Sequence, residues 1–134
     1  MLKLKTVIII AASTEYYDWL KKHHVKKPEN KLYVQGRNFE YAVMKKLRAH
    51  GFYCVRKFGS IGFEDVAGYK WGQMLFVQCK HSKIRDTKPE QFDLEGLKQL
   101  ARRFGAEAVF AGVRNHRMYF MIWNGRKWVE WKPN

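Results

Sequence analysis

An acid, an amide and an ammonium group occupy positions that a β-hairpin would bring together: Asp65, Gln78 and Lys80. If the hairpin turns near Trp71, antiparallel pairing places Asp65 opposite Gln78. The two-residue period of a strand then puts Gln78 and Lys80 on one face and Cys79 on the other. The three polar groups would converge at one end of the hairpin, where they could form a catalytic site. The alternative is an ordinary salt bridge at a solvated strand end.

A second carboxylate, Glu40, lies among apolar residues of a predicted helix. The helix is expected over residues 38–50 and ends at Gly51. At about 100° per residue its apolar side chains fall on one side. They are Phe39, Val43, Met44 and Leu47. Glu40 falls inside that arc, so it needs a cation or metal to compensate its charge, unless it lies partly exposed at the helix start, where the helix dipole favours it.

The elements that would position these residues form an α/β pattern. Strands are expected at residues 52–58, 65–69, 73–80, 108–113, 118–123 and 127–131. Asn124-Gly125 indicates a tight hairpin turn. Thr87-x-x-Glu90 is a capping box that should open a second helix running to Phe104. The order of helix, strands, helix and further strands predicts an α/β sandwich around a mixed sheet.

The composition indicates one folded, strongly basic domain. The 134 residues are 46% hydrophobic, which is enough for a core and excludes global disorder. Lys and Arg number 26 against 12 Asp and Glu, for a net charge of +14. This excess predicts a polyanionic partner, either nucleic acid or an acidic membrane surface. The charge is spread along the chain, which favours a globular nucleic-acid binder over a domain with a basic arm.

The cysteine content and the apolar runs bear on localisation. Two cysteines, Cys54 and Cys79, are too few for a secreted disulfide framework. The apolar run at residues 7–12 is shorter than a signal-peptide core or a membrane span. We therefore expect a cytoplasmic protein with no membrane partner.

Several short motifs occur in a characteristic order. They are Gly36-Arg37-Asn38-Phe39-Glu40, Gly51-Phe52, Val55-Arg56, Gly59-Ser60, Asp65-Val66-Ala67, Gln78-Cys79-Lys80 and the stretch at 99–106. In this order they resemble the archaeal-type Holliday junction resolvases of the PD-(D/E)XK nuclease superfamily. The resemblance implies a restriction-endonuclease-like fold, with a central mixed β-sheet flanked by helices. Because the matching motifs start at Gly36, we expect a nuclease domain over residues 36–134. The break at Pro28-Glu29-Asn30 predicts that residues 1–35 form an extension, which holds a short strand or helix and a linker.

The resemblance implies a role for each matching residue. Glu40 and Asp65 would be metal ligands, and Gln78 stands where the family has its second acid. The backbone carbonyl of Cys79 would add one more oxygen. Lys80 would position or activate the attacking water and stabilise the pentavalent phosphate.

The resemblance further implies contacts with DNA and a partner. Ser60 matches a serine in the family's loop beside the scissile strand. The candidates for DNA phosphate contacts are Arg37, Arg56, Lys57, Lys83 and Arg85. The implied cofactor is Mg²⁺, for which Mn²⁺ can substitute, and the implied partners are branched or duplex DNA and a second copy in a homodimer.

The sequence departs from the family pattern at two positions. Gln78 replaces the usual Glu, and its amide can ligate through oxygen but brings no charge, so metal affinity should fall. Glu64 precedes Asp65 where Pro is common, and it should point to the opposite face from Gln78. The expected function is a metal-dependent, structure-selective DNA endonuclease of the Holliday junction resolvase type. The open alternatives are a general, restriction or repair nuclease, a catalytically weakened branched-DNA-binding protein, and an RNA-binding module.

Overall fold

The computed structural model describes residues 31–57 and 64–134, which belong to one compact unit, Lys31–Asn134. Ser60 and most of the predicted N-terminal extension lie outside the described residues. The elements are α2 (Lys31–Arg48), β1 (Tyr53–Arg56), β2 (Val66–Lys70), β3 (Gln73–Cys79), the 3-10 helix η1 (Pro89–Gln91), α3 (Glu95–Phe104), β4 (Glu107–Arg114), β5 (Arg117–Trp123) and β6 (Trp128–Trp131).

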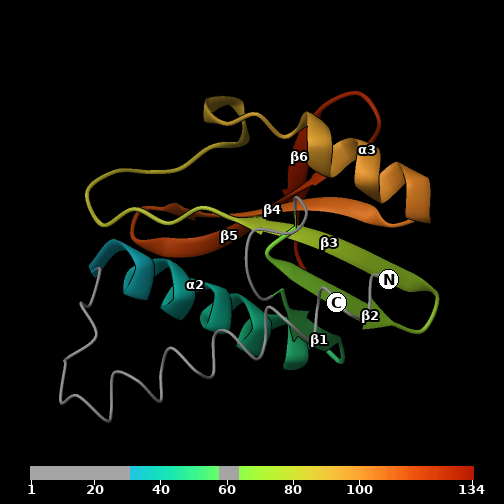
Figure 1. Cartoon of the computed structure of the whole chain (residues 1–134), viewed down its shortest axis with the longest axis horizontal. Coiled ribbons are helices and arrows are strands. Elements are labelled where there is room, and N and C mark those ends of the chain that lie inside the picture. The colour runs from blue at the N-terminus through green and yellow to red at the C-terminus, as the bar shows by residue number, and fades with distance from the viewer. Residues whose placement is uncertain (1–30, 58–63) are drawn as a thin grey trace, which may run out of the picture. The chain divides into compact units, whose positions relative to one another are not determined.

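A single mixed sheet organises the described part of the chain. Its six strands lie in the order β1-β2-β3-β4-β5-β6. All neighbours pair antiparallel except β3 and β4, which are parallel. A parallel pair needs a crossover connection, and the chain makes it through η1 and α3. Figure 1 shows α2 and α3 on opposite sides of the sheet. The predicted α/β architecture with a mixed sheet is confirmed.

Helix α2 covers one face of the sheet with the apolar stripe that its periodicity predicts. Phe39, Val43, Met44 and Leu47 are all buried. They pack in one core with residues of β1–β5, and a smaller core lies beneath α3 on the other face. Among the described residues, no helix is both long and apolar enough to cross a membrane.

Helix α2 begins earlier than expected, at Lys31 instead of residue 38. The sequence predicts that residues 31–35 belong to a linker, but they are helical. Gly36 is tolerated inside α2, although glycine costs about 1 kcal/mol relative to alanine in a helix interior. The Arg37 guanidinium lies 5.9 Å from the centre of the Tyr33 ring, one helical turn earlier. Such i,i+4 contacts stabilise a helix beyond what single-residue propensities suggest.

The second predicted helix is wrong at its start. The chain forms η1 first, and α3 begins only at Glu95, whose backbone N–H donates to the Asp93 side chain at 3.2 Å. Thr87 does not cap a helix. It is buried, its hydroxyl donates to the Lys80 carbonyl at 2.8 Å, and it accepts from the Val113 amide at 2.9 Å. The Thr87 side chain, which the sequence pattern predicts to cap a helix, therefore makes hydrogen bonds to distant residues instead.

Gly112 in β4 makes room for this buried threonine. A Cβ at Gly112 would lie 2.6 Å from Thr87 Oγ1 and 2.5 Å from Phe110 Cε1, closer than real Cβ atoms come. Gly112→Ala is therefore expected to lower the free energy of unfolding by about 1–3 kcal/mol, measured by urea denaturation. Gly36→Ala is the control, because no atom lies within 4 Å of its added Cβ, and we expect it to stabilise by about 0.5–1 kcal/mol. Equal effects of the two variants would contradict this packing.

Candidate active site

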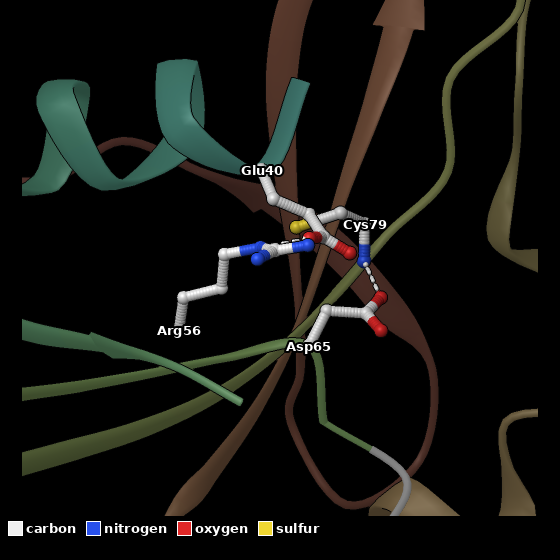
Figure 2. Close-up of polar contacts among 4 residues, drawn as sticks. All are labelled: Glu40, Arg56, Asp65 and Cys79. Atoms are coloured by element: carbon white, nitrogen blue, oxygen red, sulfur yellow. Dashed lines mark hydrogen bonds and ion pairs between the residues drawn. The ribbon is translucent and has the colours of Figure 1, made fainter. Parts of the chain in front are cut away.

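The β2–β3 hairpin sets the position of the central acid. Val66 pairs with Val77, and the Asp65 backbone N–H donates to the Val77 carbonyl at 2.8 Å. The predicted register, with Asp65 opposite Gln78, is thereby confirmed. The Asp65 side chain is held too, because the backbone N–H of Cys79 donates to its Oδ2 at 2.8 Å (Figure 2).

Helix α2 brings a second carboxylate to the same place. Figure 2 shows the side chains of Glu40 and Asp65 extending toward one another beside Cys79. Because α2 begins at Lys31, Glu40 lies in the middle of the helix. The alternative that it lies at the helix start is therefore wrong. A cation compensates it instead: Arg56 Nε donates to Glu40 Oε2 at 2.6 Å, and both side chains are less than one-fifth exposed.

Burial dominates the electrostatics of Asp65. It raises the pKa of this carboxyl above its ordinary value, although the hydrogen bond from the Cys79 N–H lowers it. The nearby charges of Glu40 and Glu64 raise the pKa further, and the Lys80 ammonium lowers it. The net direction is upward. The ionised carboxylate therefore lies in surroundings where added positive charge would be strongly favourable.

Lys80 lies just beyond the end of β3, in a tightly fixed stretch of backbone. Its N–H donates to the Ala111 carbonyl at 2.9 Å, and its own carbonyl accepts from the Thr87 hydroxyl at 2.8 Å. Its Nζ lies 4.9 Å from the centre of the Phe92 ring. Half-buried Gln78 is paired with Phe110 of β4, and within the described part of the chain its amide makes no hydrogen bond. That amide is thus available to a ligand.

Glu64 and Lys57 form a second, partly buried ion pair that the sequence did not reveal. Lys57 Nζ donates to Glu64 Oε1 at 2.5 Å, and the Glu64 side chain is only 8% exposed. Within residues 31–57 and 64–134, the Glu64 Oε2 atom has no hydrogen-bond partner. Two of the expected phosphate-binding cations, Arg56 and Lys57, are therefore engaged by carboxylates in this structure.

The other predicted DNA-contact residues lie on α2 and on the loop that follows Lys80. Arg37 is on α2, one turn before Glu40. Lys83 and Arg85 are exposed on the loop that follows Lys80. Ser60 lies outside the described residues. The structure thus brings together Glu40, Arg56, Asp65, Cys79 and Lys80, and their roles in binding and catalysis stay predictions.

The available donors fit a hard divalent cation. In residues 31–57 and 64–134, no three His, Cys, Asp or Glu side chains form a metal-binding cluster. The carboxylates of Glu40 and Asp65 lie here beside Cys79 (Figure 2), and β3 also carries Gln78, whose amide has an oxygen, and the backbone carbonyl of Cys79. The Cys79 thiol is no candidate ligand, because burial raises its pKa well above the ordinary value. Mg²⁺ is commonly held by one or two carboxylates, and water and substrate phosphate complete its coordination.

Comparison with known proteins identifies relatives of this chain. The family model for the archaeal Holliday junction resolvase (Hjc) matches residues 31–127. The crossover junction endodeoxyribonuclease Hjc of Methanocaldococcus jannaschii is 30% identical over 102 residues, which cover 72% of this chain and 76% of that protein. Among solved structures, the Holliday junction resolvase Hjc of Archaeoglobus fulgidus matches with a TM-score of 0.54 and 22% identity, covering 72% of this chain and 84% of its own.

These findings agree with each other and with the architecture. The structural match supports the α/β nuclease fold, and the family model spans every element from α2 to β5. The chain therefore belongs to the archaeal Holliday junction resolvase family.

Proposed function

We propose that this protein is a metal-dependent endonuclease that hydrolyses phosphodiester bonds in branched DNA, with the four-way junction as its preferred substrate. Its family membership supports the proposal. The observation that carries it is the half-buried Asp65 carboxylate, which accepts a hydrogen bond from the Cys79 N–H and has Glu40 and Lys80 near enough to shift its pKa. This arrangement of charged residues is well suited to phosphodiester hydrolysis. As an ordinary surface salt bridge it would contribute little to the stability of the protein.

The candidate site residues have two roles, namely binding the metal ion and stabilising the negative charge on the attacked phosphate. Glu40, Asp65, Gln78 and the Cys79 carbonyl would hold Mg²⁺, or Mn²⁺ in its place. The bound ion would supply positive charge to the phosphodiester and lower the pKa of an attacking water. Lys80 would place its ammonium where the attacked phosphate gains negative charge, and two hydrogen bonds hold the backbone from which that side chain extends.

The substrate itself favours a dimer. A four-way junction has approximate two-fold symmetry, and its resolution requires two paired cuts. A two-fold symmetric homodimer would present one active site to each of the two strands. We therefore propose that the working unit is a homodimer, which equilibrium sedimentation with and without junction DNA would test.

Cleavage of an end-labelled four-way junction, compared with a linear duplex of the same sequence, tests the proposed function. We expect paired cuts near the branch point that require Mg²⁺ or Mn²⁺. Asp65→Ala serves as the control for contaminating nuclease and should show no cuts. Equal cleavage of the linear duplex would favour a general nuclease of the same fold.

Gln78 favours a second candidate, a branched-DNA-binding protein with little or no catalysis. Gln78→Glu separates the two, because one more carboxylate should raise Mn²⁺ affinity roughly tenfold, equal to about 1.4 kcal/mol. Titration calorimetry would measure that affinity and single-turnover assays the cleavage rate. Gln78→Met is the matched control, which removes the oxygen donor and should weaken Mn²⁺ binding. Tight junction binding with no cleavage by either the wild type or Gln78→Glu would establish the second candidate.

A further inference from the structure

The loop of residues 81–86 begins directly after Lys80 and is closed at its base. The two residues that flank it are bonded to each other, since the Thr87 hydroxyl donates to the Lys80 carbonyl at 2.8 Å. Thr87 also exchanges backbone and side-chain hydrogen bonds with Val113 of β4, each of 2.9 Å. The Tyr119 hydroxyl donates to the Thr87 carbonyl at 2.5 Å. The residues at both ends of the loop, Lys80 and Thr87, are therefore hydrogen-bonded to each other, and Thr87 is also hydrogen-bonded to the sheet.

The loop has further attachments on either side of its tip. The His81 ring lies 5.1 Å from the Phe39 ring, centre to centre, which ties the first loop residue to α2 next to Glu40. At the other end, Asp86 Oδ1 accepts from the Asn115 backbone N–H at 3.0 Å. In Figure 1 this segment, drawn in yellow-green, passes from the end of β3 beyond the first turn of α2. Short loops with joined ends and fixed flanks are frequently functional.

The tip of this loop displays one aliphatic side chain between two cations. Ile84 is 86% exposed, and Lys83 and Arg85 on either side of it are exposed as well. The Ile84 N–H donates to Ser82 Oγ at 3.3 Å, which shapes the tip. A single exposed isoleucine is ordinary on a protein surface. What distinguishes this one is its place at the tip of an anchored loop that directly follows Lys80, between two cationic side chains.

Branched DNA offers a surface that matches this arrangement. At a branch point the stacking of base pairs is interrupted, so apolar base faces become available that a continuous duplex keeps covered. Proteins that deform DNA insert aliphatic side chains, isoleucine among them, at such steps. In linear duplex the same contact costs several kcal/mol of unstacking, whereas at a branch point the stack is already open.

We propose that Ile84 is the branch-point contact of this protein. Its side chain packs against base faces exposed at the point of strand exchange, while Lys83 and Arg85 contact the adjoining phosphates. The inference rests on the proposed function, since it names the residue through which the same site distinguishes branched from linear DNA.

Binding measurements in EDTA, where no metal-dependent cleavage occurs, test this inference. Fluorescence anisotropy would give the dissociation constants of the full chain for a four-way junction and a linear duplex. We expect Ile84→Ser to weaken junction binding about tenfold and to change duplex binding less than twofold. With 2-aminopurine at the branch point, the fluorescence change on binding should be lost in Ile84→Ser and retained in Ile84→Leu.

Trp71 provides the matched control. It is a fully exposed apolar residue, and it lies in the β2–β3 turn, at the opposite end of the hairpin from Asp65 and Cys79. Trp71→Ser should leave both dissociation constants unchanged. Suppose that the wild type prefers the junction. Equal weakening of junction and duplex binding by Ile84→Ser, or no weakening of either, would then overturn the inference. A wild type with no preference for the junction would instead overturn the proposed function.

Discussion

Asp65→Asn is expected to abolish DNA cleavage and at the same time to stabilise the free protein at neutral pH. The lost carboxylate is the central ligand of the proposed metal site, so the cleavage rate should fall on the order of 1000-fold. The amide keeps an oxygen that can accept from the Cys79 N–H, which preserves the local geometry. Junction binding in EDTA should therefore persist.

The gain in stability follows from the raised pKa of Asp65. Burial is the main cause of that raised pKa, so the folded protein holds the proton more tightly than the unfolded chain does. The favourable contribution of the protonated carboxyl is present below its ordinary, unfolded-state pKa and is lost as pH rises through the higher pKa of the folded state. At neutral pH the ionised carboxylate opposes folding, and Asn removes that charge.

Thermal unfolding of wild type and Asp65→Asn at several pH values would measure this effect. We expect a higher Tm for the variant at pH 7 and a difference that shrinks below the ordinary pKa of an aspartate. Glu107→Gln is the control, because Glu107 is an exposed carboxylate that accepts from the Gln73 side chain at 2.8 Å. A lower Tm for Asp65→Asn at pH 7 would show that the carboxylate is already compensated in the free protein.

Lys80→Met is expected to lower the single-turnover cleavage rate roughly 100- to 1000-fold, with little change in junction affinity. Methionine keeps an unbranched apolar stem that can pack near the Phe92 ring, so the change removes mainly the ammonium group. Lys80→Arg should not restore the rate, because a planar guanidinium cannot replace a compact ammonium.

Lys70→Met is the matched control for Lys80→Met. Lys70 also lies near a phenylalanine ring, with its Nζ 5.3 Å from the centre of Phe52. It stands at the turn end of β2, beside Gln73, and its Nζ donates to the Asn134 carbonyl. We expect it to change the cleavage rate less than twofold. Similar losses in both variants would indicate a general dependence on positive charge, with no specific role for Lys80.

Local rules predicted the parts of the site that depend on short sequence separation. A two-residue turn at Trp71-Gly72 fixes the register between β2 and β3, so Asp65 opposite Gln78 followed from counting. The 3.6-residue period likewise identified the buried face of α2 and the unusual position of Glu40. These inferences needed only geometry within one element or one hairpin.

Ion pairs and hydrogen bonds between residues far apart in the sequence could not be predicted from these local rules. The chain has 26 Lys and Arg residues, and nothing in their spacing selects Arg56 for Glu40 or Lys57 for Glu64. Thr87 shows the same limit, because a Thr-x-x-Glu pattern suits a helix cap and a buried anchor equally well. Only the packing of β4 against the loop decides between them.

In the loop at residues 81–86, the residues that attach it to the sheet are different from the residues that it exposes at its tip. The hydrogen bonds that fasten it join Lys80, Asp86 and Thr87 to one another or to β4, β5 and the turn between them, and the exposed tip at residues 83–85 contributes to none of them. Mutations at the tip can therefore accumulate without disturbing the sheet or the lysine beside it. If Ile84 contacts the branch point as proposed, exchange of the tip sequence should change the preference among branched DNAs while the fold stays intact.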